Sequence, residues 1–212
     1  MSHDTVLHGI LRPAVRVLAR TRVTPDHLTG LRFATAVAAA VFFAQGSDTW
    51  TGIGAGVFTV SALLDRADGE LARQTGRFSR HGHRYDLLAD CLAGIMAFVG
   101  LGIGAAGGVL GPAAVVLGVL AGAGIGGLFW EINVAAPGRL PGWTGRSGRV
   151  LADPDDGIFA LPLLVLCFGA EAVLVPGSIV TPAGALWLAW RRRLAWRRRL
   201  DAGASLRRDI AL

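Results

Sequence analysis

The chain has 212 residues, of which 52% are hydrophobic, and its formal net charge is +6. So high an apolar fraction, with 30 glycines, excludes an ordinary soluble domain and favours a membrane protein. All 21 basic residues are arginines that lie at the ends of apolar runs, whereas a nucleic-acid surface needs them on a soluble face. We therefore expect no nucleic-acid partner. Arginine without lysine is typical of GC-rich bacterial genomes, so we expect a bacterial inner (plasma) membrane as the location.

The first 24 residues are predicted to form an interfacial helix. Residues 5–22 place Arg12, Arg16 and Arg20 four apart, with apolar residues available for the other faces. That arrangement is typical of an amphipathic helix lying on anionic lipid headgroups. A solvated tail is the alternative.

Six apolar runs follow that can cross a bilayer as helices, at about 20 residues per span. The first has a helix start, because Thr24 can cap it and Pro25 suits its first turn. The predicted spans are residues 28–45, 50–74, 83–105, 111–135, 156–172 and 177–196. The expected fold class is an all-α integral membrane protein with six transmembrane helices and an N-terminal amphipathic interfacial helix.

The arginines predict the orientation of these spans, since cytoplasmic loops carry an excess of positive charge. With both termini in the cytoplasm, all 21 arginines fall on the cytoplasmic side, including Arg32 in the first span. The predicted outer connections near residues 45–49, 104–112 and 170–182 contain none. The charged stretch between the second and third spans then lies at the cytoplasmic face.

We expect the whole chain to be one membrane domain. It divides into an interfacial helix at 1–24, a six-helix bundle at 28–196 and a basic cytoplasmic tail at 197–212. The basic sequence RRRLAWRRRL follows a span that ends in Trp187 and Trp190. We interpret it as a topology anchor with lipid contacts.

Residues 65–90, between the second and third spans, carry four aspartates, a glutamate and five arginines. Ionisable residues at membrane depth are costly and usually mark a functional site. At about 100° per residue, Asp65 and Asp68 share one helix face. Asp86 and Asp90, four residues apart, form a second stripe on the next helix. Because helices joined by a short turn are expected to be neighbours, we expect the two stripes to face each other.

Four converging carboxylates repel one another unless cations neutralise them. Sites made only of oxygen ligands suit hard divalent ions such as Mg²⁺ or Mn²⁺, which also bind phosphate oxygens. Two such ions about 3.5–4 Å apart form the clamp used in phosphoryl displacement. Gly69 and Gly82 lack side chains, so a ligand can come close to the backbone there. The stretch therefore predicts a metal-dependent phosphoryl-transfer site.

The spacing of these residues resembles the signature of the CDP-alcohol phosphotransferase family, D-x2-D-G-x2-A-R-x8-G-x3-D-x3-D. The eight specified positions are all present, at Asp65, Asp68, Gly69, Ala72, Arg73, Gly82, Asp86 and Asp90. The six spans and the interfacial N-terminal helix are also similar to that family. The resemblance implies a membrane enzyme of phospholipid biosynthesis. It would move a phosphatidyl-type group from a CDP-linked lipid, such as CDP-diacylglycerol, to an alcohol acceptor and release CMP.

The resemblance also implies a role for each residue. Two divalent cations, Mg²⁺ or Mn²⁺, would be bound by Asp65, Asp68 and Asp86, with Asp90 sharing in the coordination. Asp90 would also be the general base that takes the proton from the attacking hydroxyl. Nucleotide contacts are implied for Gly69, Ala72, Arg73, Ser79 and Gly82, and the guanidinium of Arg73 suits a pyrophosphate. A homodimer is expected from the resemblance alone.

The motif does not specify the acceptor alcohol. Arg139, Arg146 and Arg149 lie in the predicted cytoplasmic loop between the fourth and fifth spans. They can bind an acceptor that carries its own phosphate, such as glycerol phosphate or inositol phosphate. The bias of positive charge toward cytoplasmic loops explains these arginines equally well.

Other interpretations stay open. A non-catalytic divalent-cation-binding or transport protein would use the same carboxylates, but the outer halves of the spans are almost purely apolar. His81 and His83 are interpreted as turn residues rather than metal ligands. Glu131 and Asn133 either line the cavity or simply lie at the membrane interface.

Overall fold

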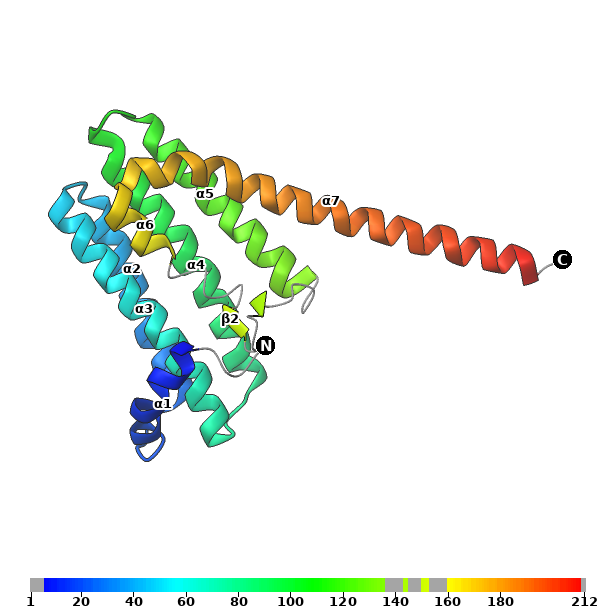
Figure 1. The fold of residues 1–212 in the computed structure, drawn as a ribbon, viewed down its shortest axis with the longest axis horizontal. Helices are drawn as coiled ribbons and strands as arrows, with labels where there is room; N and C mark the ends of the chain where they lie inside the picture. Colours follow the sequence, from blue (N-terminus) through cyan, green and yellow to red (C-terminus); the bar gives the residue numbers. More distant parts are fainter. Residues whose placement is uncertain (1–5, 136–142, 145–149, 153–159, 211–212) are drawn as a thin grey trace.

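The computed structural model describes residues 6–135, 143–144, 150–152 and 160–210. Its elements are almost all helices (Figure 1). The α-helices are α1 (Val6–Leu18), α2 (Pro25–Ala44), α3 (Asp48–Thr75), α4 (Arg80–Gly104), α5 (Ala113–Phe129), α6 (Ala160–Phe168) and α7 (Ala170–Ile210). A 3-10 turn, η1 (Ala105–Gly107), follows α4, and a π-helical turn, η2 (Trp130–Ala135), follows α5. The all-α prediction is therefore correct except for one short antiparallel pair, β1 (Trp143–Thr144) and β2 (Val150–Ala152).

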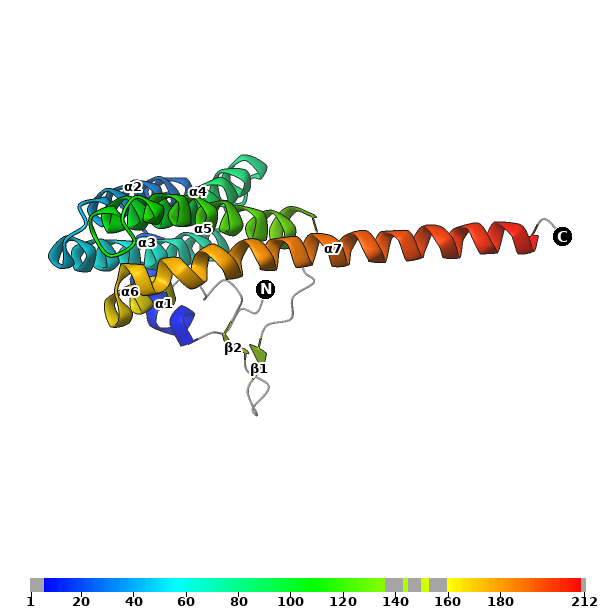
Figure 2. The same ribbon diagram turned by 90° about the horizontal axis from the view of Figure 1, so that it is seen from above.

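The closely packed helix pairs form a ring. α2 packs against α3 and α4, α5 packs against α4 and α7, and α6 packs against α3 and α7. α1 packs against α3. In both views the C-terminal part of α7 extends away from the other helices (Figures 1 and 2).

α3 and α4 make few contacts with each other, and α2 packs against both. The prediction that these two helices are direct neighbours is therefore wrong along most of their length. A short connection holds only the joined ends together, so a third helix can pack beside both partners. The residues of α2 thus lie next to both halves of the charged stretch.

The starts of the site-bearing helices follow local sequence rules. Thr24 caps α2 by accepting a hydrogen bond from the backbone N–H of His27 at 3.3 Å, as the sequence predicts. α3 ends at Gly76, whose φ of 65° is the left-handed conformation that glycine adopts without strain. Three residues later Ser79 caps α4, with its hydroxyl 2.8 Å from the N–H of Gly82. These signals place the turn between the two pairs of aspartates.

Small residues let the helices of the bundle approach one another closely. A Cβ atom on Gly102 of α4 would lie 2.7 Å from the carbonyl oxygen of Ala114 and 3.0 Å from the Cα of Gly118, both in α5. A Cβ on Gly124 of α5 would lie 2.6 Å from the Cδ of Pro182 in α7. Packing of this kind is typical of helices in membranes, where small residues at the interface increase van der Waals contact.

The apolar core lies between these helices. It is built around the buried rings of Phe43, Phe58 and Phe98 and the side chains of Leu101 and Leu174, with alanines filling the gaps. A second, smaller cluster joins α1 to the bundle: Val15, Leu28, Ala67 and Leu71. The second cluster holds α1 against the helices that carry the first two aspartates and Arg32.

Four helices of the described chain are long and apolar enough to cross a membrane: Pro25–Ala44, His81–Gly107, Ala113–Ala135 and Ala170–Arg197. They coincide with the first, third, fourth and sixth predicted spans. The second predicted span, 50–74, lies within the 28 residues of α3, whose second half carries the charged residues.

The predicted fifth span, 156–172, is not confirmed by the described residues. The described helix in this segment, α6, has 9 residues. It is therefore about 14 Å long, whereas a bilayer core is roughly 30 Å thick. Gly169, with φ of 83°, separates α6 from α7.

The predicted outer connection at 170–182 is wrong, because those residues are helical and include Pro176 and Pro182. The predicted tail at 197–212 is likewise helical as far as Ile210. Prolines are tolerated within membrane helices, so α7 continues through both.

The close approach of α4 and α5 predicts the effect of a single methyl group. Gly102→Ala should lower the free energy of unfolding by about 1–3 kcal/mol, because the new Cβ meets backbone atoms that cannot move alone. Unfolding in mixed detergent micelles with increasing dodecyl sulfate measures the change. Gly56→Ala in α3 is the matched control, since a Cβ there would meet nothing within 4 Å. Equal stability of the two variants would contradict this account of the packing.

Candidate functional site

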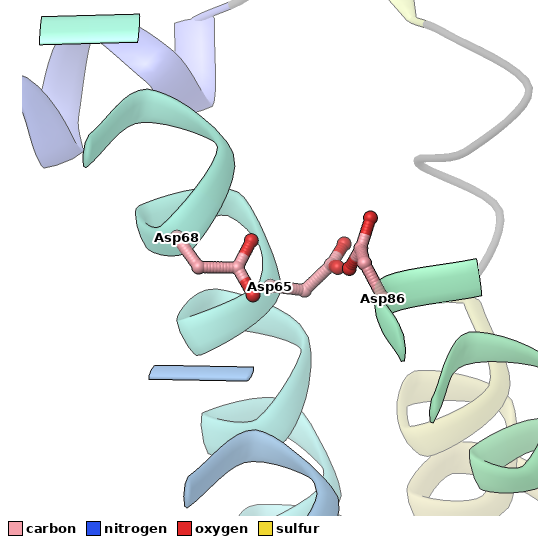
Figure 3. Close-up of side chains that lie close together, drawn as sticks. All are labelled: Asp65, Asp68 and Asp86. Carbon is pink, nitrogen blue, oxygen red and sulfur yellow. The ribbon is translucent and has the colours of Figure 1, made fainter. Parts of the chain in front are cut away.

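Three of the predicted aspartates converge in the structure. Asp65 and Asp68 project from α3 toward Asp86 of α4 (Figure 3). One carboxylate oxygen from each of the three lies within 4.8 Å of the other two. Asp68 is buried, while Asp65 and Asp86 are partly exposed. The structure thus unites residues from both halves of the charged stretch.

Asp90 belongs to the same site through an arginine that the sequence analysis assigned to membrane topology. Arg32 of α2 is 1% exposed. One of its guanidinium nitrogens, Nη1, pairs with Asp65 and with Asp86, the latter at 2.9 Å, and Nη2 donates to Asp90 at 2.6 Å. One buried cation therefore contacts three carboxylates on two helices.

A second residue of α2 also reaches the site. The hydroxyl of Thr29 donates to Oδ2 of Asp68 at 2.8 Å. Thr29 is itself buried, so this hydrogen bond is shielded from water. The contacts of Thr29 and Arg32 together give each of the four aspartates a partner on α2.

Neither Thr29 nor Arg32 was identified as a site residue from the sequence. The signal for Arg32 was present, because it is the one charged residue in the apolar run 28–45. A charge inside such a run is costly unless it is paired with another. Nothing in the sequence set Thr29 apart from the other hydroxyl residues.

Glu70 holds Arg73, the arginine of the motif, near the C-terminal end of α3. Oε2 of Glu70 accepts hydrogen bonds from Nε and Nη2 of Arg73 at 3.1 and 3.0 Å. Its other oxygen accepts from Gln74 at 2.9 Å and lies 3.7 Å from Nε of Arg12 in α1. The guanidinium of Arg73 is partly exposed, so it is both oriented and accessible.

The small residues of the motif differ in how closely they are packed, and Gly82 is the crowded one. A Cβ on Gly82 would be 2.7 Å from Oδ1 of Asp26 and 2.9 Å from the hydroxyl of Ser79. A Cβ on Gly69 would be 3.6 Å from Nη1 of Arg73, an ordinary contact distance. Ala72 is partly buried on the same helix, and Ser79 has a structural role as the cap of α4.

A partly buried ion pair joins η2 to α7. Glu131 lies in η2 and receives two hydrogen bonds from Arg192 of α7, at 2.9 and 3.0 Å. Glu131 is 8% exposed, so its charge is compensated by Arg192 rather than by water. Asn133 donates to the backbone carbonyl of Phe129 one turn earlier, which gives it a local structural role.

Several predicted residues do not join the site. His81 and His83 are exposed, and neither belongs to the acidic cluster found among the described residues. Arg139, Arg146 and Arg149 lie outside the described residues, so the structure does not test their proposed contact with an acceptor.

The donor set fits a hard divalent cation. Mg²⁺ and Ca²⁺ bind oxygen ligands at about 2.0–2.6 Å, so two oxygens on one ion lie up to about 4–5 Å apart. The separations among Asp65, Asp68 and Asp86, within 4.8 Å, are of that size. Carboxylate oxygens alone, without thiolate or imidazole, favour Mg²⁺ or Mn²⁺ over softer metals.

Comparison with known proteins gives one family for most of the chain. Residues 22–190 match the family model described as CDP-alcohol phosphatidyltransferase. A phosphatidylinositol phosphate synthase from Streptomyces avermitilis is 38% identical over 100 residues, which is 47% of this chain and 40% of that protein. An archaetidylinositol phosphate synthase from Pyrococcus horikoshii is 33% identical over 89 residues, which is 42% of this chain and 46% of that protein. The matches thus span less than half the length of these two curated relatives.

The fold is also similar to a solved structure. The crystal structure of Mycobacterium tuberculosis phosphatidylinositol phosphate synthase with CDP-DAG bound superposes with a TM-score of 0.56 at 23% identity. The similarity covers 87% of this chain and 94% of that chain. At this level of identity the comparison establishes the fold.

The buried hydrogen bond between Thr29 and Asp68 predicts a measurable loss of stability. Thr29→Val keeps the shape of the side chain but removes the donor, so the free energy of unfolding should fall by about 1–3 kcal/mol. Thr35→Val is the control, because the Thr35 hydroxyl donates to backbone carbonyls of its own helix. Unfolding in dodecyl sulfate compares the two. A larger loss for the Thr35 variant would show that Thr29 is not an important partner of Asp68.

Proposed function

The chain belongs to the CDP-alcohol phosphatidyltransferase family, and on that premise we propose that it transfers a phosphatidyl-type group from CDP-diacylglycerol to an alcohol. The observation that carries the proposal is the convergence of Asp65, Asp68 and Asp86 from two helices. These aspartates occupy motif positions inside the matched segment 22–190. With four helices apolar enough to span a bilayer, the chain is an integral membrane protein.

The carboxylate site is proposed to bind Mg²⁺ or Mn²⁺. Asp65, Asp68 and Asp86 would hold the metal, and Asp90 would share in holding a second ion. Bound there, divalent cations neutralise charge on the pyrophosphate and on the leaving CMP. Carboxylates fixed by α2 keep their oxygens in place for this purpose, so little reorganisation is needed when the donor arrives.

Asp90 is proposed as the general base. Its Oδ1 accepts a hydrogen bond from Arg32, so we propose that Oδ2 takes the proton from the acceptor hydroxyl. The acceptor oxygen forms a bond to the phosphorus of the phosphatidyl group as the bond from that phosphorus to the bridging oxygen breaks. The bridging oxygen leaves as part of CMP with its electron pair.

The nucleotide is proposed to lie beside the C-terminal end of α3, on the cytoplasmic side. Arg73, held by Glu70, presents its guanidinium to the pyrophosphate. Gly69 and Ala72 are small residues on the same helix, and Gly82 and Ser79 at the start of α4 are the other proposed contacts. Support for these contacts comes from their positions in the motif and from the orientation of Arg73.

The acceptor is proposed to be a phosphorylated polyol of the inositol phosphate class. The two relatives are named as synthases of phosphatidylinositol phosphate and archaetidylinositol phosphate. Arg139, Arg146 and Arg149 are the proposed contacts for the phosphate of that acceptor. Their support is the sequence alone, because they lie outside the described residues.

The membrane arrangement is also part of the proposal. We place six transmembrane helices in one domain, with α6 as the described part of the fifth, α1 in the interface, and the active site and both termini on the cytoplasmic side of a bacterial plasma membrane. The distribution of arginines supports this orientation. A homodimer is proposed from the family resemblance.

The direct test is a transfer assay with purified protein. With radiolabelled CDP-diacylglycerol, Mg²⁺ and a panel of alcohols, we expect CMP release that depends on inositol phosphate and stops when the metal is chelated. Asp90→Asn should reduce kcat by about 10²–10⁴-fold, the usual contribution of a general base. The proposed function would be contradicted if none of the alcohols in the panel supported CMP release. Full turnover by Asp90→Asn would contradict it as well.

The orientation of Arg73 predicts an effect on donor binding. Glu70→Gln removes the charge that holds the guanidinium, so KM for the CDP-linked lipid should rise about three- to tenfold, with a smaller change in kcat. Glu171→Gln, which changes an acid in the first turn of α7, is the charge-matched control. Kinetics at saturating acceptor separate the two parameters. An unchanged KM in Glu70→Gln would mean that Arg73 does not need this partner.

A further inference from the structure

Arg32 is the residue on which three of the four aspartates converge. Its guanidinium contacts Asp65 on α3 and both Asp86 and Asp90 on α4. The side chain is 2% exposed, whereas those of its three partners are 16%, 34% and 25% exposed, respectively. The arginine therefore lies beneath the carboxylates, on the side closed by the protein, and the carboxylates keep access to the open side.

The backbone of Arg32 is anchored as firmly as its side chain. Its carbonyl oxygen accepts hydrogen bonds from the hydroxyl of Ser61 in α3 at 2.9 Å and from Thr35 at 2.7 Å. The bond from Ser61 joins α2 to α3 one turn before Asp65. The backbone and the guanidinium of Arg32 thus both contact α3, the helix that carries Asp65 and Asp68.

The hydrogen bonds that Thr29 and Arg32 of α2 donate go to Oδ1 of Asp65, Asp86 and Asp90 and to Oδ2 of Asp68. A carboxylate can accept several hydrogen bonds or metal contacts, so this arrangement is compatible with a cation on the open side. The four aspartates and Arg32 together carry a formal charge of −3.

We propose that Arg32 is a permanent cationic member of this site, which positions Asp65, Asp86 and Asp90 and weakens the binding of divalent cations to them. The inference rests on the proposed function, because it assigns a role toward the metal site described there. The charge of Arg32 also makes the pocket less negative, which favours approach of an anionic CDP-linked donor.

Two effects of Arg32 on metal affinity oppose each other. Its hydrogen bonds hold the ligands in place, which helps binding, while its charge repels a second cation in the same partly dry site, which hinders binding. A bound metal orients its own carboxylate ligands, so the help from Arg32 is partly redundant once the metal is present. The repulsion persists as long as both cations are there, so the charge effect should dominate.

The test measures Mn²⁺ binding without substrate. Purified wild-type protein and the variants Arg32→Met and Arg32→Lys are titrated with Mn²⁺ in detergent, and free Mn²⁺ is quantified by electron paramagnetic resonance. Arg32→Met should bind Mn²⁺ at least tenfold more tightly than the wild type. Arg32→Lys, which keeps the charge, should stay within threefold. Both variants should lose at least tenfold in kcat, because methionine has no donor and the single nitrogen of lysine cannot reproduce the separate positions of Nη1 and Nη2.

Arg77→Met is the matched control, since Arg77 is exposed in the connection between α3 and α4 and the substitution removes the same charge. Its Mn²⁺ affinity and turnover should equal those of the wild type. If Arg32→Met does not yield folded protein, Arg32→Gln carries the same comparison, because glutamine retains amide donors for the carboxylates.

The outcomes separate this inference from the proposed function. Equal or weaker Mn²⁺ binding by the neutral variants, in a protein whose wild type binds Mn²⁺ and releases CMP, would overturn the role of Arg32 alone. A wild-type protein that binds no Mn²⁺ would contradict the proposed metal site, and the role of Arg32 would fall with it.

Discussion

The pairing of one buried arginine with aspartates from two helices is the interaction on which this structure depends. Asp65 and Asp68 on α3 and Asp86 and Asp90 on α4 would repel one another if they converged without a cation. Arg32 supplies that cation from α2, which packs against both helices. The desolvation of a lone guanidinium inside the bundle would be equally unfavourable. Each set of charges therefore stabilises the other, and α2 lies beside both α3 and α4.

The two ends of the bundle have different roles: one holds the helices together by close packing, and the other carries the charged side chains of the site. At one end glycines such as Gly102 and Gly118 bring backbones into contact and leave no room for side chains. At the other end the helices are joined by ion pairs and capped turns, including the pair of Glu131 with Arg192. A tightly packed apolar end holds the helix axes in place, so the charged end can expose its carboxylates and still keep their geometry.

The same charged end links the site to the membrane surface. Glu70 contacts Arg73 on one side and Arg12 of α1 on the other, and Val15 of α1 packs against Leu71 in the smaller apolar cluster. The helix proposed to lie in the interface thus touches the helix proposed to bind the CDP-linked lipid. A donor with its diacyl chains in the bilayer and its nucleotide in water would meet both helices together.

The sequence by itself determined the class of protein, the helical starts and the identity of the aspartates. Long apolar runs, caps such as Thr24 and Ser79, and a fixed spacing of charges are local properties, which chain neighbours set directly. Only the tertiary structure decided which helix lies between α3 and α4, that Arg32 and Thr29 complete the site, and that α7 begins directly after Gly169. These features depend on contacts between residues far apart in the chain. Arg32 pairs with carboxylates that are 33 and 58 positions away, and no local sequence pattern predicts such a pairing.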